Sequence, residues 1–247
     1  MFESANLKVK RANQHIAALD QGLREFFQTR PCRVVSEYDL NQGCYGVRVV
    51  STTDMPVWVG IVIGDVIHNL RSGLEHVASD LYVLANGGDE QARKRSKFPM
   101  HQTRQNLVDT VNKGEIKPAL PKVAEAIVDT IQPFEAGEKL LWALGQLWNI
   151  DKHRLPIVSF AVAQINNISA RNERGFSVSE ATAIVNVGGF CDAFGSDSPF
   201  TITNEGEASY EVFFDEIGLL ERQPLIPTLV RMSQLTEQAI TTITEAI

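Results

Sequence analysis

Hydrophobic residues recur every three or four positions along residues 56–85, PVWVGIVIGDVIHNLRSGLEHVASDLYVLA. At about 100° per residue, the aliphatic side chains fall on one broad arc of a helix, which carries Val66, Ile67, Leu70, Leu74, Val77, Ala78 and Leu81. The pattern predicts one long amphipathic helix, around which we expect the rest of the chain to fold. Its glycines lower the helix propensity by up to about 1 kcal/mol each, which indicates close packing of another helix at Gly60, Gly64 and Gly73.

The same spacing of hydrophobic residues predicts further helices over residues 7–28, 103–112, 121–131, 138–153 and 224–247. Runs of β-branched residues on both sides of Asn41-Gln42-Gly43 predict a hairpin near residues 32–51. After Pro156 the pattern changes to short apolar or alternating runs that are separated by turn residues. This part predicts an antiparallel meander over about residues 155–217, with Gly188 and Gly189 in a turn or bulge.

Together these elements predict an α+β fold. We expect a helical core around the long central helix, an antiparallel sheet from the C-terminal half and a final helix that packs back onto the core. With 247 residues, of which 44% are hydrophobic, the chain is long enough to form one sizeable core, so we expect a single domain. Its helical part, hairpin included, would cover about residues 1–154, and the closing helix would cover about residues 224–247.

Charge and cysteine content narrow the classes of function. The 23 basic residues stand against 30 acidic ones, and the net charge of -7 opposes sequence-independent binding to nucleic-acid phosphates. Cys32, Cys44 and Cys191 have no metal-type spacing and leave one cysteine unpaired, which favours a reducing compartment. No apolar run approaches the ~18 residues of a membrane span, and the charged N-terminal pattern is not typical of a signal segment. We therefore expect a cytoplasmic protein with no membrane partner.

The polar face of the central helix is the first candidate site. A typical solvated face carries Lys and Glu, whereas this one carries short side chains that suit defined hydrogen bonds. The residues are Asp65, His68, Asn69, Ser72, Glu75, His76 and Ser79, with Arg71 at the edge.

Arg71 and His76 are the residue types that phosphodiester chemistry uses. An imidazole moves protons near neutral pH, and a guanidinium stabilises charge on phosphoryl oxygens. The segment RSGLEH, with four residues between Arg and His, resembles the motif of the HEPN superfamily of RNA-cleaving and RNA-binding domains. This resemblance implies a metal-independent ribonuclease or RNA-binding protein, with Arg71 binding phosphate, His76 as acid or base, and a composite site if two copies form a homodimer. Ser72 follows the arginine, where HEPN nucleases often carry Asn, Asp or His.

A second hypothesis needs no catalysis. Arg71 would pair with Glu75 one helical turn on, and His76 would cap the edge of the core. The polar face would then be a structural hydrogen-bond network in a protein that binds a small ligand or another protein. Loss of one such buried hydrogen bond would cost about 1 to 3 kcal/mol.

The segment LWNIDKHRLP, at the end of a predicted helix, supplies further polar residues. Asn149 and His153 share a face because they are four residues apart, while Asp151 and Arg154 lie at the helix end. We expect this end to meet the central helix, so that one pocket is lined by Asp65, His68, Asn69, His76, Asn149 and His153.

A metal-dependent hydrolase is the third hypothesis, since two helices that supply inward His and Asp side chains can bind a metal ion. Asp65 and His68 with His153 would be the ligands. The chain has neither an E-x-x-H pair nor a cysteine ligand set, so we assign it no metal and no cofactor.

Four separated blocks resemble a family of bacterial hypothetical proteins, which share them in this order. The blocks are GDVIHNLRSGLEH, FPM, NIDKHR and VFFDEIGLLERQPLIPTLVRM. This resemblance extends from the first helix to the last, but it implies no activity.

Overall fold

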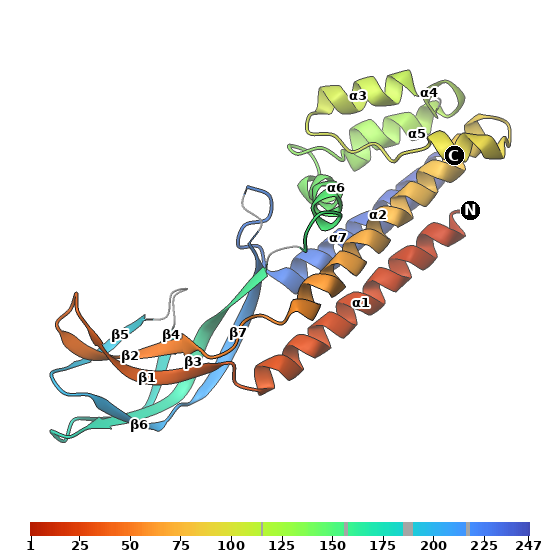
Figure 1. The fold of residues 1–247 in the computed structure, drawn as a ribbon. Coiled ribbons are helices and arrows are strands. Elements are labelled where there is room, and N and C mark those ends of the chain that lie inside the picture. The colour runs from red at the N-terminus through yellow and green to blue at the C-terminus, as the bar shows by residue number, and fades with distance from the viewer. Residues whose placement is uncertain (115, 156–157, 185–189, 216–217) are drawn as a thin grey trace. The chain divides into compact units, whose positions relative to one another are not determined.

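The computed structural model describes all residues except 115, 156–157, 185–189 and 216–217, and it confirms the predicted α+β class (Figure 1). The first half contains α1 (Glu3–Gln28), β1 (Cys32–Asp39), β2 (Cys44–Ser51), α2 (Val57–Ala85), a 3-10 helix η1 (Glu90–Arg95) and α3 (Arg104–Lys113). The middle contains α4 (Ile116–Ala119), α5 (Pro121–Glu125), a π-helix η2 (Ala126–Ile131) and α6 (Lys139–Asp151). The last part contains β3 (Val158–Asn172), β4 (Ser177–Ile184), β5 (Phe190–Ser196), β6 (Phe200–Asn204), β7 (Glu207–Phe214) and α7 (Leu225–Ala246).

The chain divides into two compact units, and each unit is assembled from segments that are far apart in the sequence. The helical unit comprises Met1–Asp20, Val57–Ile157 and Glu216–Ile247. The sheet unit comprises Gln21–Pro56 and Val158–Asp215. The single domain expected from the sequence stays a prediction.

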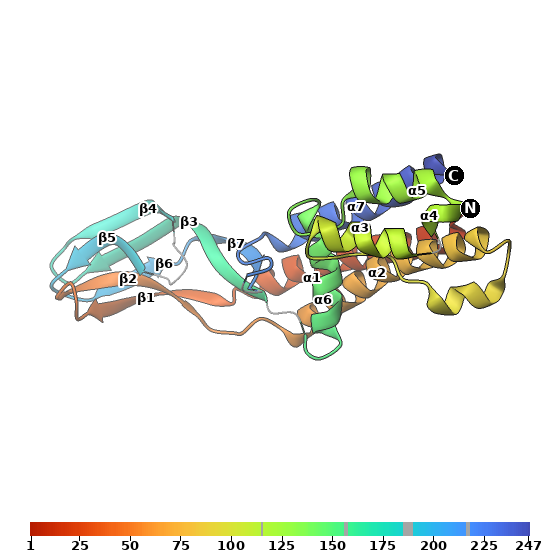
Figure 2. The ribbon, with the colours of Figure 1, turned by 90° about the horizontal axis from the view of Figure 1, so that it is seen from above.

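In the helical unit, α2 runs alongside α1 and α7 (Figures 1 and 2). Every aliphatic residue of the predicted apolar arc is buried, which confirms α2 as the centre of this unit's core. Asn13 joins α1 to α7, because it accepts a hydrogen bond from Ser233 Oγ at 2.6 Å and donates one to Glu237 Oε1 at 3.2 Å.

The glycines of α2 lie where other helices come close. A Cβ atom at Gly73 would lie 3.4 Å from the carbonyl oxygen of Ala5 and 3.5 Å from a methyl group of Val9, both in α1. A Cβ atom at Gly64 would overlap the carboxylate of Asp151 at the end of α6. The close helix packing that the sequence predicts is therefore confirmed at these two positions.

The sheet unit contains two antiparallel sheets. One has the strand order β1-β2-β5, and the other has the order β4-β3-β6, with β7 also paired to β3. They share one core, formed by Val34, Val47, Ile165, Ile168, Ala170 and Phe200. The predicted hairpin is β1–β2, and the pairing of β2 with β5 places it in the sheet unit rather than with the helices.

Strands β6 and β7 follow each other along β3 and are separated by a kink at Glu205 and Gly206. Gly206 has φ +77°, and a Cβ atom there would overlap the carbonyl oxygen of Asn166 and lie 2.9 Å from Ile165 Cγ2. The kink thus requires glycine both for its backbone conformation and for its close approach to β3.

We expect Gly206→Ala to destabilise the protein more than Gly175→Ala. Both glycines have positive φ, which costs an alanine roughly 1–2 kcal/mol, but a Cβ atom at Gly175 meets nothing within 4 Å. Urea denaturation of the two variants measures the difference, and equal losses of unfolding free energy would contradict the close approach.

Within the described part of the chain, no helix combines the length and the apolar composition needed to span a bilayer. The turn or bulge predicted at Gly188 and Gly189 lies outside the described residues.

Candidate functional site

Arg71 and Glu75, one turn apart on the polar side of α2, bind the backbone of Phe98 from both sides. The Arg71 guanidinium donates from Nη2 to the carbonyl oxygen of Phe98 at 3.1 Å. The Phe98 amide donates to Glu75 Oε2 at 3.1 Å. The two side chains also form an ion pair with each other, as the second hypothesis expects. This arrangement, which we call the Arg71–Glu75 clasp, fixes the FPM segment against α2.

The rest of the Arg71 guanidinium is also enclosed. Its Nη1 lies 3.0 Å from Met100 Sδ, and its Cζ lies 5.6 Å from the ring centroid of Trp148 in α6. Only 8% of the side chain is exposed. Burial lowers the pKa of Arg71, and the Glu75 carboxylate opposes that shift, so the guanidinium stays charged. Arg71 therefore has the contacts of a structural residue that holds Phe98 and Met100 between α2 and α6.

His76 lies on the same helix five residues beyond Arg71, and its side chain is half-buried. Within the described residues, no hydrogen bond or ion pair connects the imidazole to Arg71 or to any other side chain. The role as acid or base that the HEPN resemblance implies for His76 stays a prediction.

Four predicted residues gather where α2 meets the end of α6. His68 Nε2 lies 3.4 Å from Ser72 Oγ, and both residues lie on α2. Burial raises the pKa of the Asp151 carboxyl group, the nearby His68 opposes this rise, and the nearby Asp65 adds to it. These side chains form a small polar cluster at the edge of α2.

Asn69 is a structural residue. It is buried and donates from Nδ2 to the carbonyl oxygen of Asp65, one turn earlier, at 2.8 Å. Its side-chain amide therefore donates to the backbone of its own helix.

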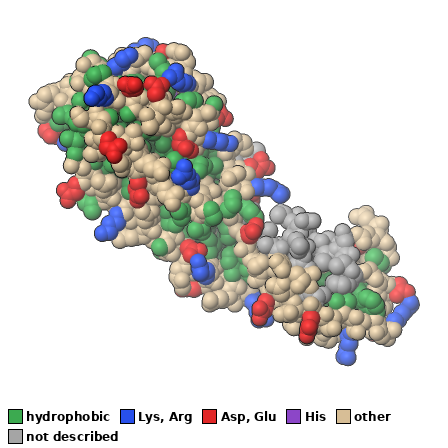
Figure 3. Space-filling model, turned by 180° about the vertical axis from the view of Figure 1, so that it is seen from behind, with side chains coloured by type: hydrophobic (Ala, Val, Ile, Leu, Met, Phe, Trp, Pro, Cys, Tyr) green, Lys and Arg blue, Asp and Glu red, His purple; other side chains and the backbone are tan. Residues whose placement is uncertain are grey.

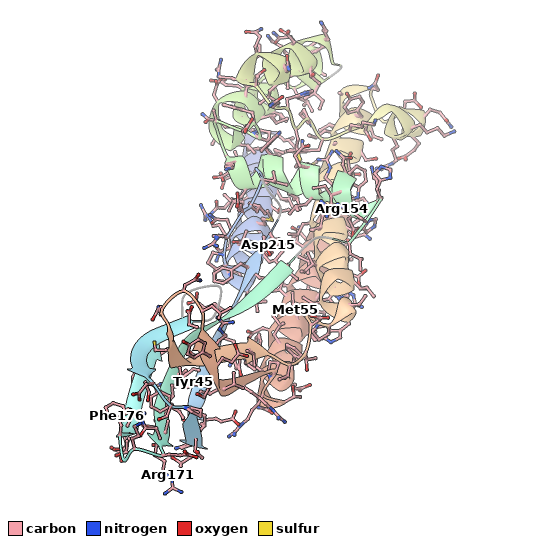
Figure 4. The ribbon with its side chains drawn as sticks, turned by 60° about the vertical axis from the view of Figure 1, so that its left-hand side comes forward. Tyr45, Met55, Arg154, Arg171, Phe176 and Asp215 are labelled. Carbon is pink, nitrogen blue, oxygen red and sulfur yellow. The ribbon has the colours of Figure 1, made fainter. Side chains whose placement is uncertain are left out.

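Asn149, His153 and Arg154 have exposed side chains, and Arg154 donates to the carbonyl oxygen of Leu155 at 3.3 Å (Figure 4). Within the described residues, no hydrogen bond or ion pair joins Asn149 or His153 to α2, and the shared pocket expected from the sequence stays a prediction. Asp151 of this segment approaches α2, because its carboxylate lies against Gly64. Among the described residues, no three His, Cys, Asp or Glu side chains are grouped so that they could hold a metal ion.

A pocket of about 300 Å³ lies entirely within the sheet unit, and the sequence patterns did not indicate it. Its walls come from the end of α1, the start of β1 and the segment around the kink between β6 and β7. The lining residues are Phe27, Gln28, Arg30, Cys32, Arg33, Val34, Ile165, Glu205, Gly206, Glu207, Ala208 and Tyr210. The local sequence feature that could have indicated this pocket is the segment RPCR, which places two arginines between a helix end and a strand start.

The pocket combines apolar surface with polar groups. The rings of Phe27 and Tyr210 stack with centroids 4.4 Å apart. Burial raises the pKa of the Cys32 thiol. Burial also raises the pKa of Tyr210; Cys32 adds to this rise and Arg30 opposes it, which places the three residues close together. Pockets of roughly 300 Å³ and above with a few convergent polar groups are typical small-ligand sites.

No family model matches the chain, and no match was found among curated proteins or solved structures. The two resemblances noted from the sequence therefore stay predictions.

We expect Arg71→Met to destabilise the protein by about 3 kcal/mol. The change leaves the Glu75 carboxylate and the Phe98 carbonyl without their buried partner, and Glu75 is only 24% exposed. Arg104→Met breaks an exposed ion pair with Asp129 and should cost at most about 1 kcal/mol. Chemical denaturation measures the loss of unfolding free energy in both variants. An Arg71→Met variant as stable as the wild type would contradict the clasp and would favour the phosphate-binding role.

We expect Asp151→Asn to stabilise the protein at pH 7. Because the folded state raises the pKa of this carboxyl group, ionisation of Asp151 weakens folding as the pH rises through that pKa. A negative charge at a helix C-terminus is also unfavourable. The gain from removing this ionisation should vanish below roughly pH 3, where the carboxyl group is protonated in both states. Melting temperatures across this pH range test the prediction, and a pH-independent difference would refute it.

Proposed function

We propose that the protein is a non-catalytic ligand-binding protein whose ligand occupies the pocket of the sheet unit. The observation that carries this proposal is the convergence of Arg30, Arg33, Cys32 and Tyr210 on one pocket of about 300 Å³. The proposal follows the second hypothesis, in which the polar face of α2 has a structural role.

The chemistry of the lining favours a small organic anion with an apolar body. Arg30 and Arg33 are exposed, and neither forms an ion pair within the described residues. A guanidinium in that state is available to bind a carboxylate or sulfonate group. Ile165, Ala208 and the ring of Tyr210 offer apolar surface to the remainder of such a ligand.

The RNA-cleaving hypothesis requires an arginine that reaches a phosphate. The enclosure of the Arg71 guanidinium by Glu75, Phe98 and Met100 supports the non-catalytic proposal instead. On the face seen in Figure 3, basic and acidic side chains are interspersed, without a continuous basic stripe of the kind that binds nucleic acid.

The probe for this proposal is 8-anilinonaphthalene-1-sulfonate, an aromatic anion that fluoresces in apolar surroundings. We expect saturable binding to the wild type, and Arg33→Glu should weaken it by about tenfold, because a charge-assisted hydrogen bond is lost and a repulsion is introduced. Arg171→Glu is the matched control: Arg171 is exposed in the same unit, at the β3–β4 end, and does not line the pocket (Figure 4). Its affinity should stay within about twofold of wild type.

Two results would overturn the proposal. One is the absence of saturable fluorescence from a folded wild-type protein. The other is equal binding by Arg33→Glu and Arg171→Glu, because the probe would then bind outside the pocket. Melting temperatures of the variants verify that both remain folded.

A further inference from the structure

The start of β1 presents a free strand edge to the pocket. Among the described strands, β1 pairs only with β2, and the Thr52 amide donates to the Pro31 carbonyl at 2.7 Å. Since backbone groups alternate in direction along a strand, Cys32 and Val34 turn their amide and carbonyl groups away from β2. The Val34 amide accordingly meets no strand and donates to the Glu205 carboxylate at 3.5 Å. These outward groups are available to an added strand.

A second free edge bounds the other side of the pocket. Of the described strands, β7 pairs only with β3. β6 approaches β1 closely, since the Phe200 amide donates to Ser36 Oγ at 2.9 Å. Beyond the kink at Gly206, the pocket separates β7 from the start of β1. The edge formed by β6 and β7 therefore lies close to β1 at the β6 end, whereas the pocket lies between β1 and β7.

The charges of the pocket differ between its two sides. Arg30 and Arg33 lie at the start of β1, whereas Glu205 and Glu207 lie on the β6–β7 side. A chain lying antiparallel to β1 would place its carboxyl end beside the two arginines. The gap faces residues 30–34 of the chain, which corresponds to roughly four extended residues at about 3.3 Å each.

We infer that the ligand of the pocket is the carboxyl-terminal end of an extended peptide, which adds a strand antiparallel to β1. Main-chain hydrogen bonds to Cys32 and Val34 hold the peptide, and the peptide carbonyl replaces the Glu205 carboxylate at the Val34 amide. Arg30 and Arg33 bind the terminal carboxylate, and the last side chain, which is apolar, packs on Tyr210 and Ala208. This inference rests on the proposed function and names its ligand class.

The test uses two bead libraries of randomised hexapeptides attached through their amino ends. One has free carboxyl termini, and the other has the same sequences as carboxyl-terminal amides. We expect fluorescently labelled full-length protein to select beads with apolar last residues from the first library and to select none from the second. Fluorescence anisotropy then gives the affinity of the selected peptides in solution.

Three changes to the selected complex separate the parts of the inference. Amidation of the peptide and Arg33→Glu should each weaken binding at least tenfold, because each removes the contact between carboxylate and guanidinium. N-methylation of the last peptide bond should weaken it similarly, because it removes a main-chain donor. Arg171→Glu should leave the affinity unchanged.

The outcomes distinguish this inference from the proposed function. Arg33-dependent binding of anilinonaphthalene sulfonate without selection of any peptide would overturn the inference and leave the proposed function in place. If the protein neither binds anilinonaphthalene sulfonate through Arg33 nor selects any peptide, the inference and the proposed function are both overturned. Peptides that bind equally as acids and amides would refute carboxylate recognition, and insensitivity to N-methylation would refute strand addition.

Discussion

The ion pair between the buried Arg71 and the half-buried Glu75 is the interaction on which the order of the helical unit depends. Taking a guanidinium and a carboxylate out of water costs several kcal/mol, and the pair is tolerable only when its remaining donors and acceptors are satisfied. The backbone of Phe98 meets much of this requirement, because it offers one carbonyl and one amide to the pair. Among the described residues, the buried Arg71 Nε has no hydrogen-bond partner. The charges thereby specify where the FPM segment lies.

The position of the FPM segment in turn constrains α6. Met100 lies between the Arg71 guanidinium and Gly145, where an added Cβ atom would be 3.0 Å from the Met100 sulfur. Trp148 of the same helix stacks with Lys152, whose Nζ is 3.2 Å from the ring centroid, and also approaches Arg71. A network of this kind specifies one helix register, which explains polar residues at positions where a simple core would have aliphatic ones.

The sheet unit has a shared core and two strand edges that are not paired with each other. Its core residues come from both sheets, but the strand edges of β1 and β7 are not joined across the pocket. Natural proteins usually protect such edges with charges, and the Glu205 carboxylate at the Val34 amide does so here. In the proposed complex, a peptide carbonyl would take the place of this carboxylate at the Val34 amide.

The amphipathic pattern by itself determined α2, the hairpin and the closing helix, because helix and strand periods are local properties of the chain. It also placed Arg71 within reach of Glu75, since residues four apart on a helix are neighbours. Tertiary structure alone decided that Phe98 completes the clasp and that Asp151 meets Gly64. It also decided the pocket, which joins residues 27–34 to Ile165 and residues 205–210. The pocket depends on strand register and on the kink at Gly206. All of these contacts join segments that are far apart in the sequence, so no periodic pattern indicates them.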